Sequence, residues 1–105
     1  MSEYQIIKRD GAPRVPFKFD GRILYTSDRF EMVYLTLLPG AGMELHSQPF
    51  DVVFYLIAGT GILTINQQES EVQPETSVWV KADALRAWKN NGTGVLNLLV
   101  CKLKS

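Results

Sequence analysis

His46 is the only histidine of the chain, and it lies in the stretch GAGMELHSQPFDVVFYLIAG, residues 40–59. An imidazole can act as a general base, bind a metal ion or make hydrogen bonds inside a core. Side chains two residues apart on a strand project from the same face. A regular strand from 44 to 48 would therefore bring Glu44 and Gln48 beside His46, and such a cluster could hold a hard or borderline cation loosely. The stretch raises three alternatives: a metal site, a catalytic residue and a structural histidine.

The elements around His46 are predicted to be short β-strands. Segments rich in β-branched and aromatic residues alternate with turn signals such as Pro39-Gly40 and the GTG at 59–61. The predicted strands are 22–26, 30–38, 52–58, 61–66, 77–80 and 94–103. Regular short strands separated by turns favour a sandwich or a barrel. The exception is DALRAWKNNG, residues 83–92, for which propensity alone predicts a short helix capped by Asp83 and ended by Gly92.

The segment 30–38 is apolar on both of its predicted faces. One face carries Phe30, Met32, Tyr34, Thr36 and Leu38, and the other carries Glu31, Val33, Leu35 and Leu37. A strand of this kind is covered on both sides, as when a small barrel packs its outer face on a second chain. The pattern favours a homodimer, although a two-layer monomer would give a similar pattern.

Length and composition limit the classes of function. With 105 residues the chain can form one proper core, and residues 1–105 are expected to be a single domain. Eleven basic residues balance eleven acidic ones and are scattered, so we expect no nucleic-acid partner. The longest apolar run, 52–58, is too short to cross a membrane, and the first residues show no apolar signal core. Cys101 is the only cysteine, which excludes an internal disulfide and favours a cytoplasmic location.

The stretch 40–59 resembles the first conserved motif of the cupin family, G-x5-H-x-H-x3or4-E-x6-G. Gly40 and His46 have the spacing of the motif, Gly59 closes it, and DVVFYLIAGTG is similar to the EEVFYVLEGEG often seen there. The second motif, G-x5-P-x-G-x2-H-x3-N, falls on residues 75–90, where only Asn90 is retained. The resemblance implies an all-β fold, the double-stranded β-helix or jelly roll, with N-terminal strands in 1–30 and the conserved barrel in 31–103. It also implies that 86–89 form a strand rather than a helix.

The resemblance implies where a metal would bind, and most of that site is replaced. Metal-binding cupins hold one divalent ion with two histidines and a glutamate of the first motif and a histidine of the second. Carried over to this sequence, His46 is kept, whereas Gln48, Val52 and Arg86 stand at the other three positions. A glutamine oxygen is a weak donor, valine offers none, and arginine brings a positive charge. We expect a degenerate metal site and no cofactor; a divalent metal held weakly by His46 with Glu44 or Gln48 is the disfavoured alternative.

The same substitutions favour a metal-free binding site. A guanidinium at the mouth of an apolar barrel, facing an imidazole and an amide, could bind a carboxylate or a phosphate. We therefore predict that His46, Gln48 and Arg86 recognise a small polar or anionic metabolite. Some metal-free cupins are sugar epimerases with a histidine base, and by that resemblance His46 would take a proton while Arg86 stabilises the resulting anion. The alternative function is an enzyme of this isomerase type, or a weakly metal-loaded oxygenase or isomerase.

Aromatic residues are predicted to complete the pocket. Trp88 shares a face with Arg86, and the apolar lining is predicted to come from Trp88, Tyr34 and Tyr55. Packing in the core is the alternative for these rings. For Arg86 the structural alternative is an ion pair with Glu44, Asp51 or another acid that closes the end of the barrel. A barrel that serves only as an interaction scaffold, without a ligand, is the third hypothesis.

Overall fold

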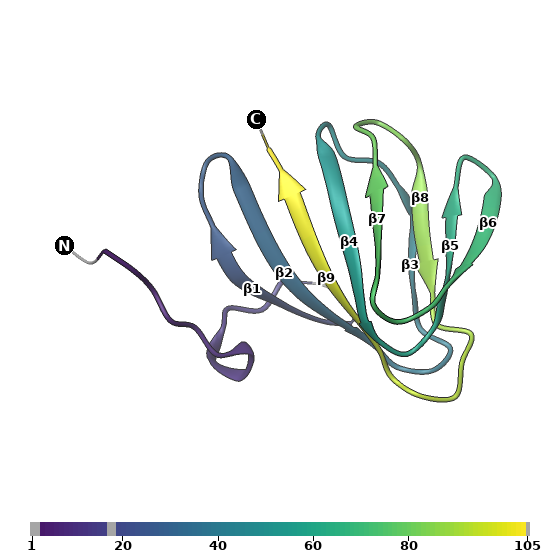
Figure 1. The fold of residues 1–105 in the computed structure, drawn as a ribbon, viewed down its shortest axis with the longest axis horizontal. Coiled ribbons are helices and arrows are strands. Elements are labelled where there is room, and N and C mark those ends of the chain that lie inside the picture. The colour runs from purple at the N-terminus through teal and green to yellow at the C-terminus, as the bar shows by residue number, and fades with distance from the viewer. Residues whose placement is uncertain (1–2, 17–18, 105) are drawn as a thin grey trace.

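The computed structural model describes residues 3–16 and 19–104, and in these ranges the chain forms two antiparallel sheets (Figure 1). The described strands are β1 (Asp20–Thr26), β2 (Phe30–Leu37), β3 (Gly42–His46), β4 (Asp51–Ala58), β5 (Gly61–Ile65), β6 (Gln68–Val72), β7 (Thr76–Val80), β8 (Arg86–Lys89) and β9 (Leu96–Leu103). A short 3-10 helix, η1 (Arg9–Gly11), precedes β1. One sheet has the order β1-β2-β9-β4-β7 and the other β3-β8-β5-β6. The predicted all-β jelly-roll class is confirmed, and in the described part of the chain no helix could cross a bilayer.

Alternate residues along the strands of both sheets point inward, and they form the core between the sheets. The inward residues of the five-stranded sheet are Val33, Leu35, Leu37, Val52, Phe54, Leu56, Leu96, Leu98 and Val100, all buried. Leu63 and Trp88 from the four-stranded sheet pack against them, and the Trp88 ring meets Phe54 edge-on with centroids 5.5 Å apart. This closed apolar core fixes the two sheets relative to each other and so positions the residues that line their open end.

β8 is a strand, so the helix that propensity predicts for 83–92 is wrong and the family expectation for 86–89 is confirmed. Tertiary pairing overrides local propensity here, because β8 lies between β3 and β5 and hydrogen-bonds to both. Arg86 and Trp88 are buried while Lys89 is exposed, the alternation of a strand. A turn precedes β8, with Asp83 at a φ of 69° and its N–H donating to the Gln48 carbonyl at 2.7 Å.

The six strands predicted from composition are all present, with ends shifted by two residues or fewer. The composition did not indicate β6, because its first four residues are exposed and polar. β6 is joined to β5 through Asn66 and Gln67, whose φ values of 47° and 73° form the left-handed turn that suits a tight hairpin.

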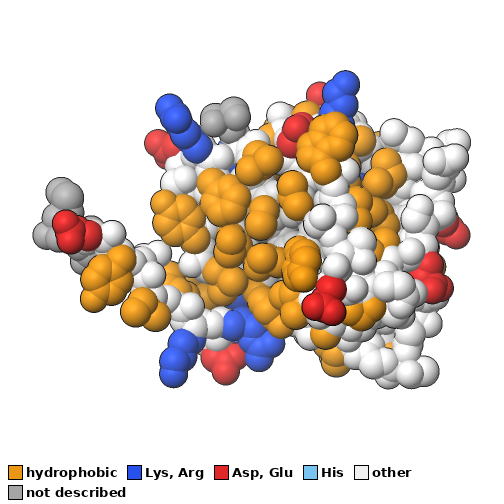
Figure 2. All heavy atoms as spheres, viewed as in Figure 1, with side chains coloured by type: hydrophobic (Ala, Val, Ile, Leu, Met, Phe, Trp, Pro, Cys, Tyr) orange, Lys and Arg blue, Asp and Glu red, His pale blue; other side chains and the backbone are white. Residues whose placement is uncertain are grey.

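The outer face of the five-stranded sheet carries apolar side chains that cross it strand by strand. One row contains Tyr25, Met32, Cys101, Val53 and Trp79, and a second contains Tyr34, Leu99 and Tyr55. Trp79 is 60% exposed and Tyr25 47%. Figure 2 shows hydrophobic side chains gathered over β1, β2, β9 and β4 on this side, which we call the outer apolar face. The outward residues of β2 are only partly exposed in the single chain, whereas Tyr25 and Trp79 on the flanking strands are exposed.

Candidate functional site

The pairing of β3 with β8 places His46 beside Arg86. The two residues are directly paired, and Met43 is paired with Trp88 one level deeper. A bulge between Met43 and His46 interrupts the alternation, so both side chains turn toward the interior while Glu44 is exposed. The regular strand over 44–48 that would align Glu44 with His46 is therefore not formed.

In the facing sheet, Lys102 lies level with this β3–β8 pair. Val100 and Lys102 are successive inward positions on β9, and Val100 is paired with Phe54. Phe54 contacts Trp88, so these two rings occupy one layer of the barrel. The next layer toward the mouth therefore contains Lys102 from one sheet and the His46–Arg86 pair from the other.

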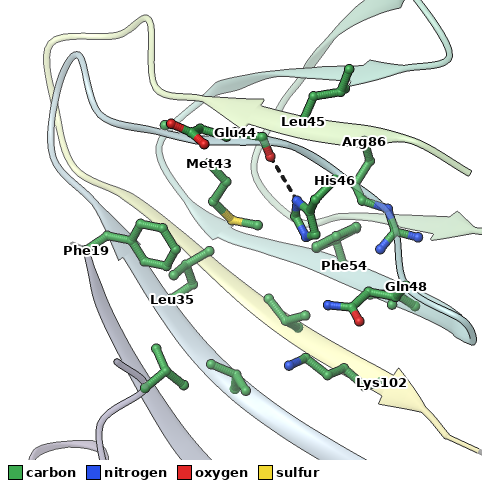
Figure 3. Close-up of a pocket in the computed structure, with 15 residues that line it drawn as sticks. Phe19, Leu35, Met43, Glu44, Leu45, His46, Gln48, Phe54, Arg86 and Lys102 are labelled. Carbon is green, nitrogen blue, oxygen red and sulfur yellow. Dashed lines mark hydrogen bonds between the residues drawn. The ribbon is translucent and has the colours of Figure 1, made fainter. Parts of the chain in front are cut away.

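A cavity of about 530 Å³ opens between the sheets at this layer. Its volume falls within the roughly 300–1,000 Å³ range of small-molecule sites. Figure 3 shows the side chains of His46, Gln48, Arg86 and Lys102 converging in it. The apolar part of the lining comes from Val15, Phe19, Val33, Leu35, Met43, Leu45, Val52, Phe54 and Val100. The structure thus brings together the three polar residues that the sequence predicts and adds a fourth.

Arg86 is a buried cation whose hydrogen-bonding capacity is only partly used. Its side chain is 1% exposed, and its Nε donates to the Ala84 carbonyl at 3.0 Å. Its Nη2 is buried and has no hydrogen-bond partner among the described residues. None of the ion pairs formed by the described residues includes Arg86, and burial lowers the pKa of its guanidinium. An unpaired buried donor of this kind is unfavourable unless a ligand meets it.

The predicted ion pair between Arg86 and Asp51 is absent from the described residues. The Asp51 carboxylate instead accepts hydrogen bonds from Trp79 Nε1 at 3.1 Å and from the Ala82 N–H at 2.9 Å. These bonds hold Asp51 at the β7 end of the sheet, while the next residue, Val52, points into the core. Among the ion pairs that the described residues form, none joins Arg86 to Asp51 or to Glu44.

The His46 ring is oriented by its own strand. Nδ1 lies 2.8 Å from the Glu44 carbonyl oxygen. Because a carbonyl only accepts, Nδ1 carries the hydrogen of this bond, and in the neutral ring Nε2 has the free lone pair. His46 lines the cavity, so this nitrogen can accept a hydrogen bond or a proton from a bound molecule.

Gln48 is held in place through its backbone. Its carbonyl accepts the Asp83 N–H at 2.7 Å, which ties the 47–50 connection to the turn that leads into β8. Within the described residues its side-chain amide makes no hydrogen bond to His46 or Arg86. The amide lines the cavity, where both its donor and its acceptor can serve a ligand.

Lys102 and Glu31 were not among the residues singled out from the sequence. Lys102 Nζ donates to Glu31 Oε2 at 3.1 Å, and the two side chains are 22% and 18% exposed. Burial alone would raise the pKa of Glu31, but hydrogen bonds from Lys102 and Thr26 outweigh this and hold it below its ordinary value. Their positions in the sequence could have identified them, because each continues the inward-facing apolar series of its strand, Glu31 before Val33 and Lys102 after Val100.

The predicted aromatic lining is corrected by the structure. Trp88 is not part of the cavity lining; it is 1% exposed and packed on Phe54. Tyr34 and Tyr55 project from the outer apolar face, and Arg9 stacks over the Tyr34 ring at 5.2 Å. Strand parity decides this, because Tyr34 and Tyr55 alternate with the inward residues of β2 and β4. Phe19 and Met43 take the places expected for these rings.

The residues at the family's metal position do not fit a metal ion. The described residues contain no group of three His, Cys, Asp or Glu side chains that could hold one. His46 is the only one of the four positions with a strong donor, because Gln48 offers a neutral amide, Val52 no donor, and Arg86 a positive charge. Three of these four side chains therefore offer a metal ion no strong ligand.

Two antiparallel sheets packed around a cavity that opens at one end define a small β-barrel of the jelly-roll class. The family model described as "Cupin domain" matches residues 33–101, and the chain belongs to this family. No curated protein matches the chain significantly.

Several solved structures share the fold. A protein from Thermus thermophilus is 24% identical, with a TM-score of 0.77 over 88% of this chain and 89% of that one. The polyketide cyclase RemF from Streptomyces resistomycificus is 14% identical, with a TM-score of 0.84 over 97% and 80%. A predicted oxalate decarboxylase from Thermotoga maritima is 13% identical, with a TM-score of 0.83 over 94% and 98%. At these identities the likeness concerns the fold, and the named activities belong to those proteins.

Proposed function

We propose that this protein is a small-molecule-binding cupin that takes an anionic metabolite, a carboxylate or a phosphate, at the Arg86 end of its cavity. The observation that carries the proposal is that Arg86, a buried cation with an unpartnered Nη2 and without an acidic partner among the described residues, lines a cavity of ligand size. A planar anion can bind a guanidinium through two parallel hydrogen bonds. The Gln48 amide and Lys102 would supply further donors, and His46 would fix the orientation of the ligand.

Thermal-shift measurements with a panel of acetate, butyrate, succinate, inorganic phosphate and glucose test this proposal. An anion present at 100 times its dissociation constant stabilises a protein by about 2.7 kcal/mol, which amounts to a rise of roughly 10 °C or more for a domain of this size. Arg86→Met removes the charge from the cavity and should abolish the shift. Lys81→Met, which removes the same charge from an exposed position, serves as the matched control. A panel without any stabilising anion, or an undiminished shift in Arg86→Met, would contradict the proposal.

A catalytic role for His46 is the second candidate. It is supported by the Nδ1 hydrogen bond to Glu44, which leaves Nε2 as the acceptor on the cavity side of a neutral ring. In an isomerase-type step, Nε2 would take a proton from the carbon next to a carboxylate or carbonyl group, and Arg86 would stabilise the anion formed. Return of the proton to the same carbon balances the step.

Proton exchange separates a binder from such an enzyme. Each anion that binds is incubated with the protein in deuterium oxide, and loss of the carbon-bound proton signal is followed by NMR. A catalytic His46 gives exchange that His46→Gln abolishes while the ligand still binds. Binding without exchange in the wild-type protein leaves the binding function and removes the catalytic one.

We also propose that the outer apolar face packs against a second copy of this chain. The sheet that carries this face has five strands of up to eight residues, so the whole sheet measures about 24 Å by 27 Å at ordinary strand spacing and rise. That area of about 650 Å² approaches the roughly 800 Å² that each partner of a stable complex buries. The N-terminal segment extends away from the barrel (Figure 1) and carries Tyr4 and Ile6, which are 77% and 83% exposed.

Sedimentation velocity tests the dimer directly. The wild-type protein should sediment as a dimer, and Tyr55→Glu, which places a charge in the middle of the outer apolar face, should sediment as a monomer. Lys81→Glu is the control for added negative charge away from the face. A wild-type monomer at tens of micromolar would refute the second copy as the partner of this surface.

A further inference from the structure

We infer that the ligand is an amphipathic monocarboxylate, a molecule with one carboxylate and an unbranched or aromatic apolar body. This inference rests on the proposed anion-binding function and narrows it to one chemical class. Two features of the cavity carry it: the net charge of its polar end and the composition of the opposite end.

The polar end presents one uncompensated positive charge. Lys102 is paired with Glu31 at 3.1 Å, and together they are neutral. Arg86 is without an acidic partner among the described residues. A single carboxylate at this end would neutralise the guanidinium of Arg86, which lines the cavity. A phosphate dianion or a compact dicarboxylate would leave a second negative charge in a site of low dielectric, which is unfavourable.

The opposite end of the cavity is apolar. Figure 3 shows Phe19, Leu35 and Met43 on the side away from Arg86, and all three line the cavity. Val15 and Val33 extend this wall. Burial of apolar ligand atoms against such side chains is favourable by roughly 0.8 kcal/mol per methylene. A sugar or another fully polar molecule would lose its hydration at this end without gaining hydrogen bonds.

Among the described residues that line the apolar end of the cavity, Glu44 is the one that carries a charge. Its carboxylate is exposed and points away from Arg86 (Figure 3). A second carboxylate at the far end of a ligand would approach Glu44 and be repelled by it. The arrangement therefore selects a molecule that is charged at one end only, with its carboxylate at Arg86 and its apolar part between Phe19 and Met43.

Calorimetric titration with butyrate, hexanoate and octanoate tests the single positive charge at the polar end of the cavity and the apolar lining at the opposite end. Affinity should rise about fourfold for each added methylene, the equivalent of about 0.8 kcal/mol, so that octanoate binds on the order of 200 times more tightly than butyrate. Octanol, which has the same chain without the charge, should bind more weakly than octanoate. Succinate, with a second carboxylate, should bind more weakly than butyrate.

Two variants locate the ligand. Met43→Gln should weaken octanoate at least about tenfold and leave butyrate nearly unchanged, because only the longer chain reaches this side chain. Arg86→Met should weaken all three acids, and Lys81→Met none. Near-UV circular dichroism checks that each variant keeps its packing.

The outcomes separate this inference from the function on which it rests. Phosphate or succinate that binds more tightly than octanoate, with the dependence on Arg86 intact, overturns the monocarboxylate and leaves the anion site. Octanoate binding that survives both Arg86→Met and Met43→Gln overturns the inference, since the acid then binds elsewhere on the molecule. If no anion of either series binds, both proposals fall.

Discussion

Replacement of Arg86 by methionine should make the ligand-free protein more stable while removing its ability to bind anions. The guanidinium is 1% exposed and its Nη2 is unpartnered. Relief of one buried unsatisfied donor is worth about 1–3 kcal/mol, and loss of the hydrogen bond from Nε to Ala84 costs about 1 kcal/mol. Methionine fills a similar unbranched volume without a charge. The expected net gain is about 1 kcal/mol, or a melting temperature higher by roughly 4–8 °C.

Urea unfolding followed by tryptophan fluorescence, with thermal melts in parallel, measures this change. Lys81→Met should remain within about 0.5 kcal/mol of wild type, as expected of an exposed substitution. A loss of about 1 kcal/mol or more in Arg86→Met would refute the reasoning. It would mean that the guanidinium stabilises the fold through a partner inside the protein, and that the residue is present for structure rather than for ligand binding.

Three further substitutions test the fold and the charge pair at the mouth. Asn90→Ala removes the bonds donated to the Leu37 and Gly94 carbonyls, at 2.9 and 2.8 Å, and the one accepted from the Gly92 N–H. At about 1 kcal/mol each, urea unfolding should show a loss of about 3 kcal/mol, and a loss below about 1 kcal/mol would argue against these bonds. Gly59→Ala should lower the free energy of unfolding by about 1–3 kcal/mol in the same assay, because φ at Gly59 is +82° and a Cβ there would clash with the Val95 carbonyl. An unchanged urea midpoint would argue against this backbone conformation. In the folded protein the pKa of Glu31 lies below its ordinary value of 4.5. The contribution of ionised Glu31 to the free energy of unfolding is therefore fully present above pH 4.5, and it is lost as the pH falls through the pKa of the folded state. Glu31→Gln should therefore flatten the dependence of unfolding free energy on pH below about 4.5, whereas a slope equal to that of wild type would contradict the shift.

The sequence predicted most of the fold because strand periodicity and turn residues are local signals. β2, β4 and β9 alternate buried and partly exposed residues along almost their whole length. β8 illustrates the limit of local signals, since good helix formers occupy a strand that two neighbours pair. There the family motif was the better guide, because it carries the tertiary context that propensity lacks.

The candidate site was predicted in part. His46, Gln48 and Arg86 do line one cavity, since the family frame fixes their strands. The bulge between Met43 and His46 was not predictable, because a bulge changes which residues face inward without a fixed sequence signature. It is the reason that Met43 lines the cavity and Glu44 is exposed.

Two other errors concern the side of the strand from which a residue projects. Tyr34 and Tyr55 are outward-facing on strands whose inward series are clear in the structure, whereas in the sequence both faces of β2 and β4 are apolar. Parity alone cannot decide between two apolar faces. Lys102 shows the reverse case, a charged residue on an inward series, where its position was the signal that it belongs to the site.

A crystal structure of the protein with octanoate tests the central claim most directly. We expect carboxylate oxygens about 2.7–2.9 Å from the Arg86 guanidinium, with the apolar chain of octanoate directed toward Phe19 and Met43. An acid bound only outside the cavity, or a complex in which the Arg86 guanidinium contacts a protein acceptor and not the carboxylate, would contradict it.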